Sequence, residues 1–404
     1  MDLLDNWTTV EDFEQIQKDT KEFIAQTGIA FLSDFIRIKS NEWKNANIQI
    51  GIFGESGSGK STFLNTFRGL KRGDEGFADQ GYKGNTTKKA TKYTIKDNPN
   101  ITFTDGVGCG TIQYERGYEY LKSLEIENLD FVLLMSNKNF SQDDAWFARE
   151  IRKMGKPLFF VRTKFDEILR SAKVDGITGQ NIYEEIVTVC AENIKDSGIP
   201  TTSIFIISNY DPSVGDFDKL IHAIFKTLTQ NKREALLYCI PPLSHQVIKE
   251  KKVELIRRAN RVAFLSAAGA AIPLPMLEIL NVNMLQGEIR FYMKEFSLTE
   301  EIIKNTCNKL KIVQKELMSL LPHFQSLLME GIREMVLKSI QSVLAEKTTE
   351  VMAKRFLKFI PFVGTILSSS ITFIACLKML HKEIDELEKE AHTLLDKVIE
   401  NLKL

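Results

Sequence analysis

The chain has 404 residues, with 53 basic and 53 acidic side chains and 43% hydrophobic residues. This composition is ordinary for a folded protein, and the zero formal charge lacks the basic excess that usually accompanies nucleic-acid binding, so nucleic acid is excluded as a partner. The five cysteines stand apart without zinc-site spacing, which favours reduced thiols and a cytoplasmic protein. The N-terminus lacks a signal-peptide pattern, and Asp2 predicts that the chain is not N-myristoylated.

The first predicted segment, residues 1–45, is helical, because apolar residues recur at helical spacing from about residue 10 onward. The apolar strand Ile48–Phe53 then enters a glycine-rich loop, after which a helix is expected. Two short strand patterns, 91–96 and 101–104, flank Asn98-Pro99-Asn100, which predicts an antiparallel pair joined by a tight turn.

Short apolar runs at 131–136, 158–161 and 203–207 alternate with helical patterns, which is typical of a parallel sheet covered by helices on both faces. Beyond these runs strand patterns fade and helical periodicity continues to the end, where an apolar stripe marks a long final helix. The sequence therefore predicts an α/β domain with a mostly parallel sheet over 46–232. A C-terminal helical domain over 233–404 is expected to pack with the N-terminal helices.

The glycine-rich loop fits G-x-x-x-x-G-K-[ST] without a mismatch, in the strand-loop-helix context that a phosphate-binding loop requires. Glycines let backbone N–H groups turn toward phosphate oxygens, and the helix N-terminus adds its dipole. Lys60 is predicted to neutralise the β- and γ-phosphates, and the Ser61 hydroxyl to ligate Mg²⁺. The predicted nucleotide-binding residues of this loop are Gly54, Glu55, Ser56, Gly57, Ser58, Gly59, Lys60, Ser61 and Thr62.

A second motif, Asp105-Gly106-Val107-Gly108, follows the strand pattern 101–104. The Asp105 carboxylate can approach Mg²⁺ through water, and the Gly108 N–H can reach the γ-phosphate, so both residues join the predicted site. A threonine that binds Mg²⁺ and closes over the γ-phosphate is expected upstream of this motif. The candidates, of which the second is preferred, are Thr86, Thr87 and Thr91.

A third motif, Thr163-Lys164-Phe165-Asp166, has the N/T-K-x-D pattern that reads guanine in GTPases. Asp166 would accept hydrogen bonds from guanine N1–H and the N2 amino group, a pair of donors that adenine lacks, so GTP and GDP are the predicted nucleotides. Lys164 would lie along the base, and Ser208-Asn209 would support it after the last strand. An ATPase with a degenerate base site is the alternative only if Thr163–Asp166 is a coincidence.

The motifs and their order resemble the interferon-inducible, immunity-related GTPases. This resemblance implies a Ras-like P-loop GTPase domain flanked by N- and C-terminal helices, self-assembly of GTP-bound copies, docking on intracellular membranes and a role in cell-autonomous immunity. With Lys60, the chain resembles the effector-like branch of that family, which has lysine at this position. The pieces that carry the resemblance are 54–70, 159–166, 207–209, 267–275 and 359–377.

Two features bear on hydrolysis, one a departure from the family pattern and the other a difference from Ras-like enzymes. Val107 replaces the proline of the usual D-x-P-G, so this loop is less stiff. Cys109 holds the position of the water-orienting glutamine of Ras-like enzymes, so slow hydrolysis is expected until a second copy meets the nucleotide face. The alternative is a nucleotide-gated binding module with negligible hydrolysis. The residues predicted to act on the reacting phosphate are Lys60, Ser61, Thr87 and Gly108.

Two uncharged segments, 262–277 and 359–377, are candidates for conditional membrane contact, with helices buried in the helical domain as the alternative. A basic stretch before the first segment would suit anionic lipid headgroups, with a solvated helix face as the alternative. We therefore expect a cytoplasmic protein that binds peripherally to intracellular membranes. The basic residues are Lys249, Lys251, Lys252, Arg257, Arg258 and Arg261.

Overall fold

The computed structural model describes residues 18–19, 22–23, 25–28, 31–79, 90–107, 117–195, 200, 203–270, 277–345 and 367–402. The chain divides into two compact units. The first, termed the sheet unit, is Trp43–Val247. The second, termed the helical unit, joins Met1–Glu42 to Ile248–Leu404.

The sheet unit continues past the expected boundary at residue 232, which falls inside α9 (Gln230–Cys239). Two contacts hold α9 in this unit. Lys232 Nζ lies 2.6 Å from Asp130 Oδ1, and the Tyr238 ring meets Trp43 edge-on with centroids 5.2 Å apart. Because both partners are distant in sequence, the pattern of the helix alone does not show to which unit it belongs.

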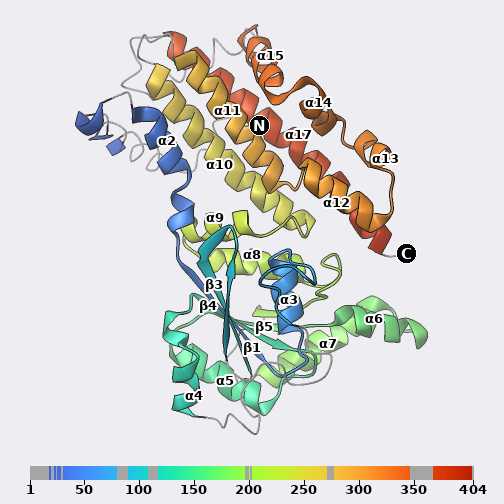
Figure 1. Cartoon of the computed structure of the whole chain (residues 1–404). Helices are drawn as coiled ribbons and strands as arrows, with labels where there is room; N and C mark the ends of the chain where they lie inside the picture. Colours follow the sequence, from blue (N-terminus) through green and yellow to red (C-terminus); the bar gives the residue numbers. More distant parts are fainter. Residues whose placement is uncertain are drawn as a thin grey trace. The chain divides into compact units, whose positions relative to one another are not determined.

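Among the described residues, six strands form one sheet in the order β2-β3-β1-β4-β5-β6 (Figure 1). Only β2 runs antiparallel to its neighbour, which confirms the mostly parallel α/β sheet. The strands are β1 (Ile48–Gly54), β2 (Thr91–Ile95), β3 (Asn98–Val107), β4 (Phe131–Ser136), β5 (Leu158–Arg162) and β6 (Ile204–Ile206). The other elements of this unit are η2 (Glu42–Asn45), α3 (Lys60–Phe67), α4 (Tyr118–Ser123), η3 (Ile126–Asn128), α5 (Gln142–Lys153), α6 (Phe165–Val174), α7 (Gly179–Ile194) and α8 (Phe217–Thr227).

Helices cover both faces of this sheet. Phe103 of β3 is in register with Ile50 of β1, and its ring meets Phe67 of α3 at 5.8 Å. Phe53 lies three residues after Ile50 and therefore points to the opposite face, because side chains alternate along a strand. On that face its ring meets Phe147 of α5 at 5.4 Å.

The predicted antiparallel pair is present, but β3 begins at Asn98 and includes Pro99. The turn therefore lies earlier than expected. Pro99 has no N–H to donate, and it is tolerated because pairing with β1 starts only at Ile101. On the β2 side, the register shifts between Thr94 and Ile95. This irregularity leaves the proline outside the regular ladder.

Three residues with positive φ end or interrupt helices of the helical unit. Lys311 takes a left-handed conformation with φ of 57° and ends α12, and Gly331 at φ 85° separates α14 from α15. Gly28 at φ 81° interrupts the predicted N-terminal helix. The helices of this unit are α2 (Leu32–Ser40), α10 (His245–Ala270), α11 (Leu277–Glu295), α12 (Glu300–Leu310), α13 (Gln314–Ser319), α14 (Pro322–Glu330), α15 (Ile332–Ala345) and α17 (Leu367–Leu402).

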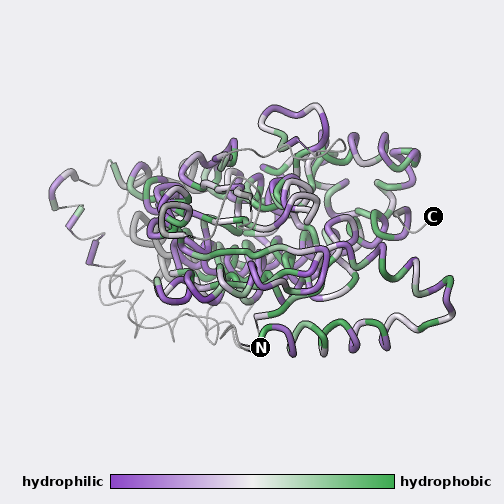
Figure 2. The backbone as a smooth tube through the Cα atoms, turned by 90° about the horizontal axis from the view of Figure 1, so that it is seen from below, coloured by the Kyte–Doolittle hydropathy of each residue, from purple (hydrophilic) through white to green (hydrophobic). Residues whose placement is uncertain are grey.

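The long helix α17 buries the apolar stripe that the sequence predicted. Six of its positions are at most 6% exposed, from Leu377 through Leu394. Green and purple alternate along the helices in Figure 2, as amphipathic elements with one buried face require. The six buried stripe residues are Leu377, Leu380, Ile384, Leu387, Ala391 and Leu394.

Both interpretations of the basic stretch, lipid headgroup binding and a solvated face, are wrong for Lys251 and Arg258. Lys251 is 1% exposed, and its Nζ lies 2.5 Å from Glu295 Oε2 on α11. Arg258 is 4% exposed, pairs with both carboxylate oxygens of Glu288 at 2.7 Å, and donates to the Ser40 carbonyl of α2. Paired charges can be buried where single charges cannot, and the partners lie on other helices.

The side chains of the two uncharged segments that the structure describes are packed inside the helical unit. Val262 and Ala263 of α10 are fully buried, as is the stretch Ile374–Leu377 of α17. Residues 271–276 and 359–366 lie outside the described residues. Within the described part of the chain, every helix is too short or too polar to cross a bilayer.

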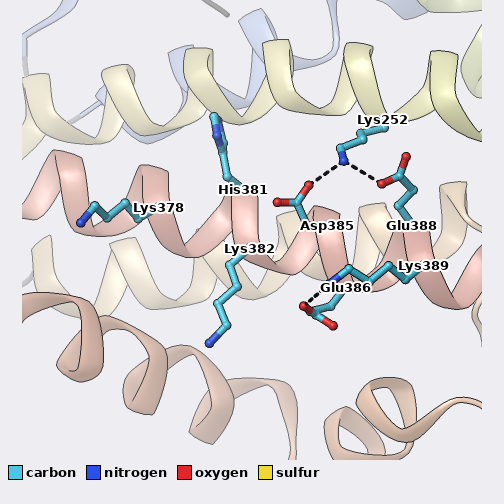
Figure 3. Close-up of a pocket in the computed structure, with 8 residues that line it drawn as sticks. All are labelled: Lys252, Lys378, His381, Lys382, Asp385, Glu386, Glu388 and Lys389. Carbon is cyan, nitrogen blue, oxygen red and sulfur yellow. Dashed lines mark hydrogen bonds and ion pairs between the residues drawn. The ribbon is translucent and has the colours of Figure 1, made fainter. Parts of the chain in front are cut away.

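A pocket of about 470 Å³ opens between α10 and α17 (Figure 3). Lys252 of α10 pairs across it with Asp385 and Glu388, each at 2.7 Å. His381 also lines the pocket, and its Nε2 lies 2.7 Å from Asn260 Oδ1 of α10. Burial lowers the pKa of His381 to about 4, an effect to which Lys252 adds and which Asp385 opposes.

The neutral state of His381 predicts acid destabilisation of the helical unit. A histidine whose folded pKa is depressed contributes stability above its unfolded pKa of about 6.5, and this stability is lost as the pH falls toward 4. The full shift corresponds to about 3 kcal/mol. His381→Gln, which keeps a polar partner for Asn260, should flatten the pH dependence of urea unfolding between pH 6.5 and 4. His222→Gln in the sheet unit is the control, and equal pH dependence in both variants would contradict this account.

Candidate functional site

The carboxyl end of β1 turns sharply into the loop 55–59, and two glycines permit the turn. Gly54 has φ of 147°, and a Cβ there would stand 1.9 Å from the Met135 carbonyl oxygen of β4. Gly59 has φ of 88° and forms the N-cap of α3, where a Cβ would stand 2.8 Å from Asn209 Nδ2. The loop therefore lies against its neighbours at distances that exclude a side chain.

Lys60 holds the loop together from inside. Its Nζ donates to the carbonyl oxygens of Gly54 at 2.8 Å and Glu55 at 2.9 Å. Burial lowers the pKa of Lys60, while the charges of Asp105 and Glu55 oppose that shift. Ser56 and Gly57 at the tip of the loop are exposed. An open loop over a buried ammonium group at a helix N-terminus suits a bound phosphate.

Asp105 and Ser61 offer a place for a divalent cation. Asp105 is 1% exposed, and its Oδ2 lies 3.4 Å from Ser61 Oγ. Its Oδ1 is buried and accepts no hydrogen bond from any described residue. Burial raises the pKa of Asp105, although Lys60 and Ser61 act in the opposite direction. A buried carboxylate oxygen that lacks a donor fits a role at Mg²⁺, which prefers oxygen ligands and bound water.

Of the three candidate threonines, the structure describes Thr91. It is exposed, begins β2, and its Cα is in register with Asp105 of β3. Thr86 and Thr87 lie outside the described residues, as do Gly108 and Cys109.

The third motif follows β5 at the same edge of the sheet. Lys164 has φ of 61° and is the N-cap of α6, so Asp166 lies in the first turn of that helix. Asp166 Oδ1 accepts a hydrogen bond from Ser208 Oγ at 2.9 Å, and its Oδ2 lies 3.0 Å from Arg170 Nη2. The Asp166 side chain is 21% exposed. Its carboxylate therefore remains open to an incoming donor.

Two residues assigned to the nucleotide from sequence direct their side chains at the phosphate loop. Thr163 is fully buried, and its hydroxyl donates to the Ser58 carbonyl at 2.7 Å. Asn209 Nδ2 donates to the Gly59 carbonyl at 3.0 Å. The backbone carbonyl of Asn209 accepts a hydrogen bond from the Thr66 hydroxyl of α3 at 3.1 Å. These hydrogen bonds tie the two ends of the site together.

Sequence reasoning missed Arg170 and gave Ser208 a passive role. Arg170 follows Asp166 by four positions on a helix, and this spacing places the two side chains on one face. The spacing is visible in the sequence and could have indicated the pair. Ser208 is fully buried, donates to Asp166, and accepts the N–H groups of Tyr210 and Asp211. No local pattern marks this role, because it depends on the pairing of β5 with β6.

The arrangement joins three functions at the carboxyl ends of parallel strands, where ligands bind in open α/β sheets. The loop 54–61 can hold phosphates, Ser61 with Asp105 can hold Mg²⁺, and Asp166 with Ser208 can read a base. Thr62 is half-buried in the first turn of α3 beside them.

The sequence matches known proteins over nearly its whole length. The family model described as Interferon-inducible GTPase (IIGP) matches residues 9–398. The mouse protein "Interferon-gamma-inducible GTPase 10" is 27% identical over 396 residues, which cover 96% of this chain and 89% of that protein. The rat "Interferon-inducible GTPase 5" is 28% identical over 361 residues, covering 88% of this chain and 77% of the relative. The mouse "Immunity-related GTPase family M protein 1" is 27% identical over 197 residues, covering 48% of this chain and 45% of that protein.

Proposed function

This chain belongs to the interferon-inducible GTPase family, and from that membership we propose how it uses its site. It binds GTP and GDP with Mg²⁺ at the carboxyl edge of its sheet. It hydrolyses GTP slowly when alone and faster when a second copy meets the nucleotide face. The observation that carries the proposal is the partly exposed Asp166 carboxylate, which accepts a hydrogen bond from Ser208. It lies in the same motif as Thr163, whose hydroxyl donates to the phosphate loop at the Ser58 carbonyl.

The selectivity for guanine follows from the acceptors that the site presents. Asp166 is an acceptor-only group when ionised, and guanine offers two donors on one edge. Adenine offers a ring acceptor there, which would leave a desolvated carboxylate without a partner. The Ser208 hydroxyl occupies one side of the carboxylate and so fixes its plane. The Arg170 pair at Oδ2 is exposed and weak, so guanine can replace it.

Asp166→Asn should change the nucleotide preference. The amide places a donor where guanine also has one, so GDP affinity should fall about 10- to 100-fold. Xanthine carries a carbonyl in place of the amino group, so XDP should bind the variant better than GDP does. Calorimetric titration of both nucleotides in Mg²⁺ measures this exchange. Asp211→Asn, which changes a carboxylate that accepts from Ser213 on the adjacent loop, should keep the preference for GDP. Unchanged preference in Asp166→Asn would refute the base assignment.

The hydrolytic step depends on groups that stabilise negative charge on the phosphates and on groups that orient the attacking water. Lys60 is buried at the phosphate loop and can offset charge that develops on the leaving oxygens. Mg²⁺, when bound near Ser61 and Asp105, supplies the charge that neutralises the β- and γ-phosphate oxygens. Cys109 stands where Ras-like enzymes hold a glutamine, and the stretch Gly84–Lys96 contains no carboxylate. Neither position 109 nor this stretch therefore offers a group to orient water, and a second copy can supply one.

GTP turnover per molecule should rise with protein concentration. A monomeric mechanism gives constant turnover, whereas a group supplied by a second copy gives turnover that increases until the dimer is saturated. Phosphate release over a hundredfold range of protein concentration, at saturating GTP and Mg²⁺, makes the distinction. Constant and measurable turnover would rule out the assembly mechanism. Turnover that stays negligible at every concentration, with GTP bound, would instead support a nucleotide-gated binding module.

We also propose that the protein associates peripherally with membranes and acts in cell-autonomous immunity. The support for this part of the proposal is family membership. The buried Lys251 and Arg258 cannot reach lipid headgroups, so any contact must use other residues or a rearranged helical unit. We expect the GTP-bound protein to float with liposomes that contain anionic lipid, and the GDP-bound protein to remain in the aqueous fraction. Equal recovery in the two nucleotide states would exclude a GTP-gated membrane role.

A further inference from the structure

The loop that carries Ser208 is closed at its base by a set of short contacts. Ile207 and Gly215 form an antiparallel bridge, and the Asp216 N–H donates to the Ile206 carbonyl at 2.6 Å. Gly215 has φ of 80°, and a Cβ there would stand 2.2 Å from the same carbonyl oxygen. The loop 208–215 therefore leaves and rejoins the end of β6 at nearly one point.

The Asp216 carboxylate is the centre of this closure. It is 3% exposed, and the Tyr183 hydroxyl lies 2.8 and 2.9 Å from its two oxygens. Lys219 Nζ lies 2.7 Å from Oδ1, and the Ile206 N–H donates to Oδ2 at 3.0 Å. One side chain thus joins β6, α7 and α8. Burial raises the pKa of Tyr183, and Asp216 adds to the shift, so the hydroxyl remains a donor.

Tyr183 also contacts the other half of the base site. Its ring meets Phe165 edge-on, with centroids 6.0 Å apart. Phe165 directly precedes Asp166, and its N–H donates to the Ile207 carbonyl at 3.1 Å. The tyrosine of α7 therefore contacts both the segment that carries Asp166 and the aspartate that closes the Ser208 loop.

We propose that Tyr183 and Asp216 are positioning residues that set the spacing between Asp166 and Ser208 and thereby determine discrimination for guanine. The inference rests on the proposed function. Their contacts are with β6, α8 and Phe165, so they act through Asp166 and Ser208. The pair holds the two loops from behind, so that the Ser208 hydroxyl stays 2.9 Å from Asp166 Oδ1 and fixes the carboxylate plane. A small misplacement of binding groups weakens a directional contact more than it weakens phosphate binding.

Tyr183→Phe tests the inference, because it keeps the ring against Phe165 and removes only the hydroxyl. Affinities for GDP and IDP are measured by calorimetry in Mg²⁺. Inosine lacks the N2 amino group, so the ratio of the two affinities reports the directional contact at Asp166. The ratio should fall about fivefold, the value of one typical hydrogen bond. A purely structural role would lower both affinities together and leave the ratio unchanged, which would overturn the inference.

Three further variants keep the test interpretable. Thr188→Val removes an exposed hydroxyl of the same helix that donates to the Glu184 carbonyl of α7, and it should leave the ratio at the wild-type value. Asp216→Asn replaces one of the two acceptor oxygens, which serve Tyr183, Lys219 and the Ile206 N–H, by a donor. It should therefore lower the ratio even if Tyr183→Phe does not fold. Tyr183→Phe added to Asp166→Asn should not change the ratio further. If the wild-type protein binds IDP and ADP as tightly as GDP, the proposed function is overturned. If the wild-type protein prefers GDP and both Tyr183→Phe and Asp216→Asn keep that preference unchanged, only this inference is overturned.

Discussion

Two hydrogen bonds to backbone carbonyls of the phosphate loop connect it to the loops that follow β5 and β6. They run from Thr163 to Ser58 and from Asn209 to Gly59, across 105 and 150 residues of sequence. Without them the phosphate end and the base end would be independent loops at the edge of a sheet. The parallel sheet makes the two bonds possible, because β1, β5 and β6 all point their carboxyl ends toward the same edge. Everything proposed for nucleotide selectivity depends on that shared edge.

Buried charge has opposite meanings in the two units. In the helical unit, Lys251 and Arg258 meet carboxylates that neutralise them, and such pairs fix how helices pack. In the sheet unit, Lys60 donates to two carbonyl oxygens, and Asp105 keeps one buried oxygen without a donor among the described residues. Groups that are buried and incompletely satisfied carry a cost, and they persist where a ligand completes them. For these four residues, the contrast distinguishes the candidate ligand site from structural ion pairs.

Asp166 and Asp216 show how the same side chain serves two purposes. Both lie near the start of a helix that follows a strand. Asp216 is enclosed and takes hydrogen bonds from three elements, so it fixes backbone. Asp166 takes one buried donor and one exposed one and keeps its outer edge open. The difference arises from neighbours on α7 and β6, which determine whether a carboxylate stabilises the loop or remains available to a ligand.

The sequence by itself determined the sheet and the phosphate loop, because both rest on local chemistry. Strand periodicity marked β1, β4 and β5, and the glycine pattern of 54–61 admits few other conformations. Short motifs also led to two predictions, the branch of the family from Lys60 and a base-reading role for Asp166. Tertiary structure alone decided where side chains point. It turned Thr163 and Asn209 toward the loop, made Ser208 a donor to Asp166, and paired Lys251 with a carboxylate on another helix. Those contacts join residues far apart in the chain, so their geometry exists only once the strands and helices have packed.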